Sequence, residues 1–165
     1  MIQAAILTIS DSVVAGTRED RSGAALKERL EALAWSVVSQ HVVPDEADQI
    51  AAKLRHLAAG DHLSLVLTTG GTGIALRDVT PEATRTVIDR EIPGLAEVMR
   101  SEGRKATPFA ALSRAVAGSC GTTLIVNLPG SPKGAVESLD AIANLIPHIV
   151  DLLHGKTQHT ASVNP

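Results

Sequence analysis

Four short apolar segments, each followed by a polar or glycine-rich turn, constrain the fold of this chain more than any other feature. Most are rich in β-branched residues and carry little polar alternation, as expected for parallel strands that are covered on both faces. Gln40 and His41 make the second segment the most polar of the four, which favours a place nearer the sheet edge for it. The four predicted strands are Ala4–Ile9, Val37–Val43, Leu63–Thr68 and Thr123–Leu128.

Amphipathic stretches with helical periodicity separate the predicted strands. The first places Leu26, Leu30 and Leu33 on one face, and Ser22 is its predicted cap. The second, Ala47–Ala58, repeats apolar residues at helical spacing and stops before Gly60. Both stretches are long enough to cover a sheet.

Later helices are marked by prolines. Thr80-Pro81-Glu82 offers a capping hydroxyl, a proline at the first helical position and an acid near the positive end of the helix dipole. Pro93-Gly94 interrupts that segment before a second, short helix. Pro147 should kink or split the last helix, which starts near Val136. The stretch 104–121 is less periodic, and we expect an irregular excursion there.

Strands that alternate with helices predict right-handed crossovers and a mostly parallel sheet. The predicted fold class is therefore α/β, a three-layer α/β/α sandwich. A chain of 165 residues and 17.1 kDa suits one domain, predicted over residues 1–154, with a polar tail over residues 155–165.

Composition excludes several classes of protein. The net charge is −3 and no run of Lys or Arg occurs, so we expect no nucleic-acid partner. The single cysteine, Cys120, excludes an internal disulfide and fits a reducing, cytoplasmic compartment. No apolar run approaches the length of a membrane span, so we expect no membrane partner. With one Trp, one Phe and no Tyr, recognition of a flat ring would depend on backbone groups and aliphatic walls.

Polar or glycine-rich turns follow all four predicted strands. In open α/β sheets, ligands bind beyond the carboxyl ends of the strands, so these turns should converge on one site. They are Ser10-Asp11-Ser12, Pro44-Asp45-Glu46, Thr69-Gly70-Gly71-Thr72-Gly73 and Pro129-Gly130-Ser131-Pro132-Lys133.

The glycine-rich turn after the third strand is a candidate for binding phosphate. Gly70, Gly71, Thr72 and Gly73 offer consecutive backbone N–H groups that side chains do not obstruct. The turn matches neither GxxxxGK[ST] nor GxGxxG. The alternative is a tight strand-to-helix turn that needs its glycines only for positive φ.

Asp45 and Asp78 are candidate ligands of one Mg²⁺, because both follow neighbouring strand–loop units. Mg²⁺ prefers one or two carboxylates together with phosphate oxygens and water, which suits nucleotidyl transfer. On local grounds Asp45 is equally well interpreted as the cap of the helix from Ala47. Asp78 should be free, because Thr80 already supplies a cap.

Basic residues near these turns are Arg77, Arg114 and Lys133. Each could neutralise phosphate, although such residues are more often solvated surface charges. The six histidines are scattered without metal-binding spacing and are interpreted as structural or exposed. Asp20-Arg21-Ser22-Gly23 is interpreted first as a helix cap and second as a ligand contact.

Together these motifs resemble the molybdopterin adenylyltransferase family of molybdenum-cofactor biosynthesis, of the MogA/MoaB type. The chain is also similar to the G domains of plant and animal molybdenum-insertion proteins. The resemblance covers roughly residues 4–154, and the stretch from Thr69 to Thr84 is its most specific part. The motifs occur in family order: SDS, DRSG, VPDE, TTGGTG, RDVTPEAT, PGL, TPFAALSRAVAG and NLPGSPKGA.

The resemblance implies a reaction in which the terminal phosphate of molybdopterin attacks the α-phosphate of MgATP, giving adenylylated molybdopterin and pyrophosphate. It implies a homotrimer, and a separate downstream protein for molybdate insertion, since this chain shows no second domain. It places catalytic and metal-binding roles on Asp45 and Asp78. Nucleotide contacts are expected at Ser10, Asp11, Gly70, Gly71, Thr72 and Gly73, and molybdopterin contacts at Ser113, Arg114, Pro129, Gly130, Ser131 and Lys133.

Two other functions stay open at this point. A non-catalytic molybdopterin-binding or scaffold module would share these motifs, although retention of both aspartates favours an active enzyme. A dinucleotide-binding oxidoreductase is disfavoured, because GxGxxG and the acidic residue about 20 positions after it are missing.

Overall fold

The computed structural model describes residues 1–60 and 62–156. Its strands form a six-stranded sheet in the order β2-β1-β3-β6-β5-β4, in which the first four are parallel and β5 and β4 run antiparallel to their neighbours. The predicted mostly parallel sheet is confirmed. The strands are β1 (Gln3–Ile9), β2 (Ser36–Val43), β3 (Leu65–Thr69), β4 (Arg90–Glu91), β5 (Ala117–Cys120) and β6 (Thr123–Leu128).

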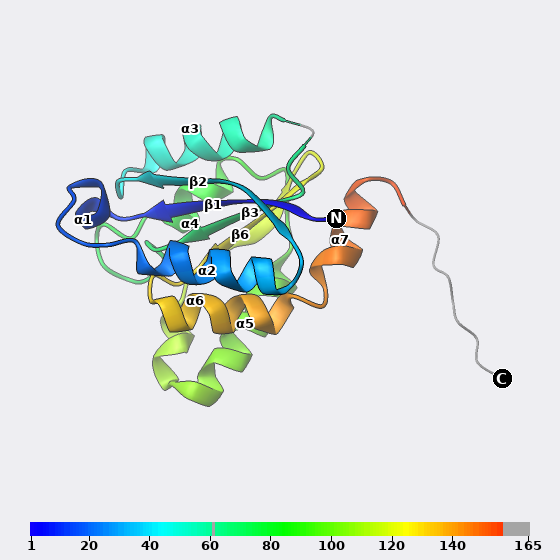
Figure 1. Cartoon of the computed structure of the whole chain (residues 1–165). Helices are drawn as coiled ribbons and strands as arrows, with labels where there is room; N and C mark the ends of the chain where they lie inside the picture. The colour runs from blue at the N-terminus through cyan, green and yellow to red at the C-terminus, as the bar shows by residue number, and fades with distance from the viewer. Residues whose placement is uncertain (61, 157–165) are drawn as a thin grey trace.

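Helices cover both faces of this sheet, which completes the predicted three layers (Figure 1). One core packs β1, β3 and β6 against α2, α5, α6 and α7, and a second core packs the opposite face against α3 and α4. The helices are α1 (Asp11–Val14), α2 (Arg21–Ala32), α3 (Ala47–Ala58), α4 (Thr80–Arg85), α5 (Pro93–Ala106), the 3₁₀ helix η1 (Pro108–Leu112), α6 (Pro132–Ile142) and α7 (Ile146–Leu153).

All four predicted strands form, and the most polar of them, β2, lies at the sheet edge as expected. The expectation of an irregular excursion over 104–121 was wrong in part, because residues 117–120 form β5 and hydrogen-bond to β6. Gly118 is required there, since a Cβ would lie 2.4 Å from the Arg90 carbonyl oxygen of β4. β4 and β5 therefore form by pairing with neighbouring strands and not because of an apolar pattern in their own sequences.

Two details of the helices differ from expectation, and a third agrees with it. Asp20, not Ser22, caps α2 by accepting a hydrogen bond from the Gly23 N–H, and Ser22 lies buried inside the helix. The helix after Pro93 is longer than predicted, with 14 residues. Pro147 does split the last helix, because α6 ends at Ile142 and α7 restarts with the proline in its first turn.

The end of α2 holds Ala34 in the left-handed region, with φ of 59°. The Ala34 N–H donates to the Glu31 carbonyl, and the Trp35 N–H donates to the Leu30 carbonyl. This pair of bonds is a Schellman motif, whose left-handed position is usually glycine.

The chain ends of the described part lie away from the carboxyl edge of the parallel strands. After α7, Lys156 forms an ion pair with Asp151, and residues 157–165 of the predicted tail lie outside the described residues. None of the helices in the described part is long and apolar enough to cross a membrane.

Candidate active site

Two cavities lie beyond the carboxyl ends of the parallel strands, where the four polar turns were predicted to converge. The polar cavity, of about 540 Å³, is lined by hydroxyl-bearing and charged side chains from β1, its following turn and the start of α2. The apolar cavity, of about 430 Å³, is lined mainly by α5, η1 and the start of α6. Gly71, Gly130 and Ser131 line both cavities, so the cavities meet at these residues.

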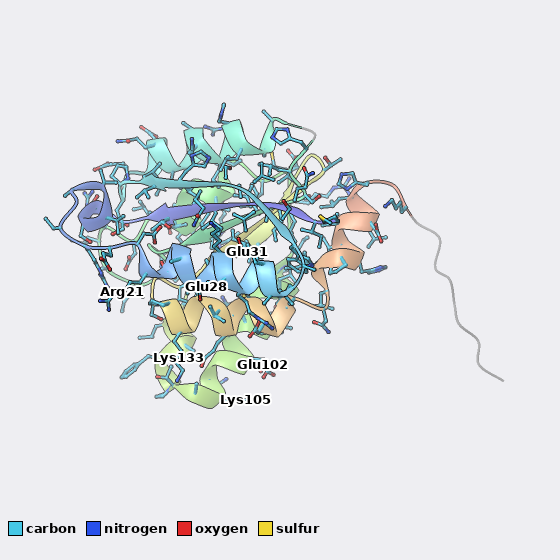
Figure 2. The ribbon with its side chains drawn as sticks, viewed as in Figure 1. Arg21, Glu28, Glu31, Glu102, Lys105 and Lys133 are labelled. Atoms are coloured by element: carbon cyan, nitrogen blue, oxygen red, sulfur yellow. The ribbon has the colours of Figure 1, made fainter. Side chains whose placement is uncertain are left out.

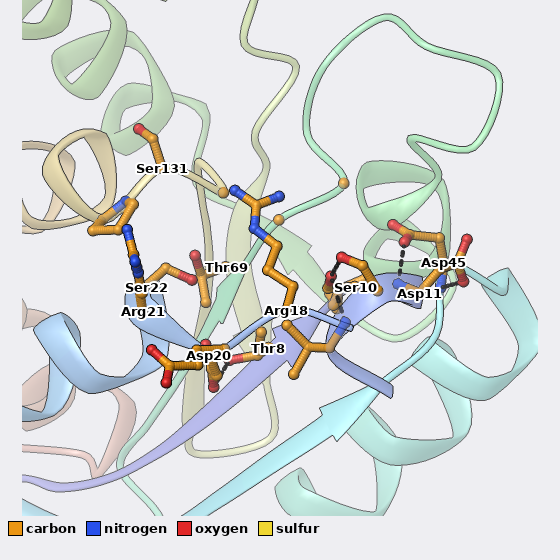
Figure 3. A pocket seen from close by; sticks show the side chains of 18 residues that line it. Thr8, Ser10, Asp11, Arg18, Asp20, Arg21, Ser22, Asp45, Thr69 and Ser131 are labelled. Atoms are coloured by element: carbon orange, nitrogen blue, oxygen red, sulfur yellow. Dashed lines mark hydrogen bonds between the residues drawn. The ribbon is translucent and has the colours of Figure 1, made fainter. Parts of the chain in front are cut away.

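The polar cavity contains side chains that the sequence analysis did not select (Figure 3). Thr8 donates a hydrogen bond of 2.7 Å to Asp20, which brings the end of β1 together with the start of α2. Arg18 reaches into the middle of the cavity between Ser10 and Ser131. The signal for Thr8 was a hydroxyl inside an otherwise apolar strand, whereas Arg18 stands in a loop with no periodic signal.

The glycine-rich turn separates the two cavities, and hydrogen bonds from the start of α4 hold it in place. Gly70 and Gly71 have φ of +105° and +66°, and a Cβ on Gly70 would lie 2.3 Å from the Ile9 carbonyl oxygen. The Thr80 hydroxyl donates to the Gly70 carbonyl over 2.9 Å, and the Thr80 N–H donates to the Gly71 carbonyl. Thr80 was predicted to cap α4, but it is the first residue of that helix, and its hydroxyl and N–H hold the glycine-rich turn in place.

A buried polar network supports Thr80 in turn. The Asn127 amide on β6 donates to the hydroxyls of Thr68 on β3 and Thr84 on α4, over 3.0 and 2.9 Å. Thr84 donates to the Thr80 carbonyl, and the Asn127 amide oxygen accepts from the Val116 N–H. The network fixes the start of α4 against the sheet.

Asp45 follows β2 and lines the polar cavity. It exchanges two backbone–carboxylate hydrogen bonds with Asp11, of 2.9 and 3.0 Å. The alternative role as cap of α3 is wrong, because the residue at that cap is Glu46, which makes no side-chain capping bond. Burial raises the pKa of the Asp45 carboxyl, the negative charges of Asp11 and Asp78 raise it further, and the Asp11 N–H and Arg77 act in the opposite direction.

Asp78 lines the apolar cavity, at the end of the loop that follows the glycine-rich turn. Asp78 was predicted to be free, but one of its carboxylate oxygens accepts the Ala75 N–H over 2.9 Å. The glycine-rich turn contacts both aspartates: a Cβ on Gly71 would lie 3.3 Å from Asp45 Oδ1, and one on Gly73 would lie 2.8 Å from Asp78 Oδ2. The structure thus brings the two predicted carboxylates to one turn.

Ser10, Ser113 and Thr72 occupy three different settings. Ser10 lines the polar cavity, where its hydroxyl caps α1 and contacts the Ser12 hydroxyl. Ser113 and Thr72 both line the apolar cavity. Thr72, which was expected with the nucleotide, therefore lies on the same side as the serine expected with the pterin.

Arg114 and Lys133 line neither cavity. Arg114 donates to the carbonyls of Gly73 and Asp78, each over 2.7 Å, and forms an ion pair with Glu82 that lowers the pKa of that carboxyl. Lys133 lies near the start of α6, among the surface charges of α2, α5 and α6, with an 82% exposed side chain (Figure 2). Arg114 closes the Asp78 loop, and Lys133 remains a surface charge.

The apolar cavity supplies the walls that a flat ring requires. Its lining includes the only phenylalanine of the chain, Phe109 on η1, a residue that is 75% exposed. Arg100 adds a guanidinium that donates to the Ser113 carbonyl. Neither was a sequence candidate, although Phe109 lies within the motif TPFAALSRAVAG and Arg100 lies between that motif and PGL.

Comparison with known proteins connects this geometry to a family. Residues 5–148 match the family described as "Probable molybdopterin binding domain". The chain is 43% identical to the molybdopterin adenylyltransferase of Helicobacter pylori strain J99, over 93% of this chain and 89% of that protein. It is 45% identical to the molybdenum cofactor synthesis protein cinnamon of Drosophila melanogaster over 90% of this chain, but it spans only 25% of that longer protein.

Solved structures agree with the sequence comparison. The molybdopterin biosynthesis enzyme MoaB from Thermus thermophilus superposes with a TM-score of 0.89 and 52% identity, over 94% of this chain and 98% of that one. The Mog protein of Mycobacterium ulcerans superposes with a TM-score of 0.85 and 38% identity, over 93% of this chain and 99% of that one. The chain therefore belongs to the molybdopterin-binding domain family that includes the bacterial molybdopterin adenylyltransferases.

Proposed function

We propose that this protein transfers AMP from ATP to molybdopterin. The phosphate of molybdopterin forms a bond to the α-phosphorus of ATP, the bond between the α- and β-phosphates breaks, and pyrophosphate leaves. The observation that carries the proposal is the placement of Asp45 and Asp78 on either side of one glycine-rich turn, where the polar and apolar cavities meet.

The two cavities differ in a way that suits two different substrates. The polar cavity offers hydroxyls together with Arg18 and Arg21, which suit the ribose and phosphates of a nucleotide. The apolar cavity offers Phe109 and aliphatic walls together with Ser113, which suit a flat pterin. Gly71 and Gly130, which carry no side chain, lie where the two cavities border each other, and we expect the phosphate groups of both ligands to approach there.

Asp45 and Asp78 fit a magnesium site by the chemistry of their donors. In each carboxylate, Oδ2 accepts a backbone N–H, and no hydrogen bond to Oδ1 occurs within residues 1–60 and 62–156. Two available carboxylate oxygens together with substrate phosphates match what Mg²⁺ prefers. A bound Mg²⁺ would offset the charge that gathers on the phosphates. The chain's own contribution is to hold both carboxylates at one turn and to present backbone N–H groups beside them.

The finer parts of the proposal concern assembly and context. We include a homotrimer, a cytoplasmic location and a separate protein that accepts the product. The trimer is supported by large apolar side chains that remain exposed in the single chain, such as Ile74 at 71% and Leu76 at 100%. The single cysteine supports a reducing compartment.

Incubation with molybdopterin and MgATP, followed by mass detection of adenylylated pterin, tests the function directly. We expect stoichiometric pyrophosphate and the adenylylated product. Binding of molybdopterin without AMP transfer would instead support the non-catalytic module, and neither binding nor transfer would refute both.

A further inference from the structure

One bidentate ion pair joins the loop that carries Asp78 to Asp11, in the turn after β1, and Asp11 bonds to Asp45. Arg77, the residue before Asp78, donates to both carboxylate oxygens of Asp11 over 2.6 and 3.1 Å. Asp11 in turn exchanges its two hydrogen bonds with Asp45. A continuous path therefore runs from Asp78 through Arg77 and Asp11 to Asp45.

The charged groups of Arg77 and Asp11 are directed at each other, although Asp11 also lines the polar cavity. Arg77 lines neither cavity, and its guanidinium also donates to Glu46 over 3.0 Å. Both Asp11 oxygens accept from Arg77, one of them also accepts the Asp45 N–H, and the guanidinium holds the pKa of Asp11 below its ordinary value. Asp11, which was expected to bind nucleotide, has the contacts of a connector.

No other hydrogen bond in the described part of the chain makes this connection, although the glycine-rich turn lies beside both aspartates. Arg114 joins residues 73–78 to Glu82 of α4, and the Ala75 N–H bonds to Asp78 within the same loop, so neither contact reaches the turns after β1 and β2. Within residues 1–60 and 62–156, each hydrogen bond between residues 73–78 and the turns after β1 and β2 comes from Arg77. Without the Arg77–Asp11 pair, only weaker contacts would fix the distance between Asp78 and Asp45.

We propose that Arg77 and Asp11 are positioning residues, which fix Asp45 and Asp78 relative to each other for AMP transfer. This inference rests on the proposed function. The pair is solvent-exposed, with side chains 57% and 45% accessible, so its contribution to global stability should be small. Its effect on turnover should be large, because displacement of a catalytic group by about 1 Å can cost roughly 100-fold.

A double-mutant cycle separates positioning from direct binding. The variants are Arg77→Met, Asp11→Asn and the double variant, each assayed for kcat and for the KM of ATP. Asn keeps an acceptor for the Asp45 N–H but loses the charge that Arg77 requires. We expect kcat to fall by about 10- to 100-fold in each single variant, and no further in the double variant, with the KM of ATP within about 3-fold of the parent. Losses that act as one unit are non-additive.

The control is Arg29→Met with Asp140→Asn. This ion pair, of 2.5 Å, joins α2 to α6 with similar exposure, 36% and 41%, but lies outside both cavities. The control should keep the parent kcat, and all variants should keep a melting temperature within a few degrees of the parent. Arg77→Lys, which keeps the charge without the two-pronged geometry, should recover only part of the lost kcat.

Three outcomes would overturn the inference. Multiplicative losses in the double variant would show that the two residues act independently. A raised KM for ATP at unchanged kcat, together with weaker binding of a non-hydrolysable ATP analogue by calorimetry, would show that Arg77 binds phosphate directly. A parent-like kcat in the Arg77→Met variant would show that positioning does not depend on the pair. Absence of AMP transfer in the parent protein would instead contradict the proposed function.

Discussion

At the scale of single residues, the proposed function places the chemistry on Asp45 and Asp78. We expect Asp45→Asn and Asp78→Asn to lower turnover by roughly 100-fold or more, the scale of losing one preorganised electrostatic group. Molybdopterin is itself anionic, so its affinity should stay near the parent value or rise slightly. The fold should survive, because neither carboxylate caps a long helix. AMP transfer and molybdopterin binding, measured on the same preparations, check both expectations, and parent-like turnover in both variants would exclude the metal-site proposal.

The raised pKa of Asp45 predicts a pH-dependent effect on stability. A carboxyl whose pKa is higher in the folded state stabilises the fold most when protonated, below its unfolded value near 3.8, and this contribution is lost as pH rises through the folded pKa. Asp45→Asn should therefore melt at or above the parent temperature at pH 7. The difference should shrink toward zero as the pH falls below 4. Thermal melts across this range test the sign, and a variant that is less stable at pH 7 would contradict it.

Ala34 is a residue at which the structure predicts a stabilising change. Its φ of 59° is costly for any residue with a Cβ, whereas glycine adopts it freely. After subtracting the larger entropy of glycine in the unfolded chain, Ala34→Gly should raise the free energy of unfolding by about 0.5–1 kcal/mol. Ala32→Gly, inside the last turn of α2, should lower it by a similar amount. Urea denaturation of both variants gives the comparison, and equal effects would refute the backbone argument.

At the scale of elements, the glycine-rich turn and the start of α4 act as one unit. A Cβ on Gly71 would lie 2.3 Å from the Thr80 hydroxyl, at a φ that also disfavours alanine. Gly71→Ala should displace the turn from Asp45 and lower turnover by at least about 10-fold. Gly94→Ala, on α5, meets no atom within 4 Å and should leave turnover unchanged. Steady-state assays of the two variants decide the matter, and parent-like activity of Gly71→Ala would mean that the turn tolerates the displacement.

The elements that the sequence predicted are those whose burial dictates their composition. β3 and β6 are covered on both faces, so nearly every residue must be apolar or a satisfied threonine or asparagine. β5 consists of Ala, Gly, Ser and Cys, and it forms a strand because its backbone pairs with the backbone of β6. Patterns along the chain cannot report such pairing, because the partner's register is set by tertiary packing.

The same division applies to the candidate site. The turns after the strands were predictable, since parallel strands bring their carboxyl ends together. The role of Arg114 was not, because its acceptors are backbone carbonyls 36 and 41 positions away in the sequence. Thr80 and Ser22 have good capping side chains, but tertiary partners or burial determine where those hydroxyls point. Local chemistry therefore predicted the edge of the sheet at which the cavities lie, but it misassigned several of the side chains that support their walls.

At the scale of the whole molecule, the proposal predicts a homotrimer in solution. Light scattering should give about 51 kDa, three times the 17.1 kDa of one chain. A larger assembly buries more apolar surface than a lone domain of this size, and fully exposed Leu76 is among the side chains that such burial would cover. A scattering mass of one chain at micromolar concentration would exclude the trimer.

The wall that the two cavities share has a thermodynamic consequence. Gly71, Gly130 and Ser131 line both cavities, so a ligand that orders these residues in one cavity changes the free energy of binding in the other. Such linkage is reciprocal: whatever factor ATP imposes on the affinity for molybdopterin, molybdopterin must impose on the affinity for ATP. Neither substrate then has a privileged place in the equilibrium, and any apparent order of addition is a matter of rates and cellular concentrations.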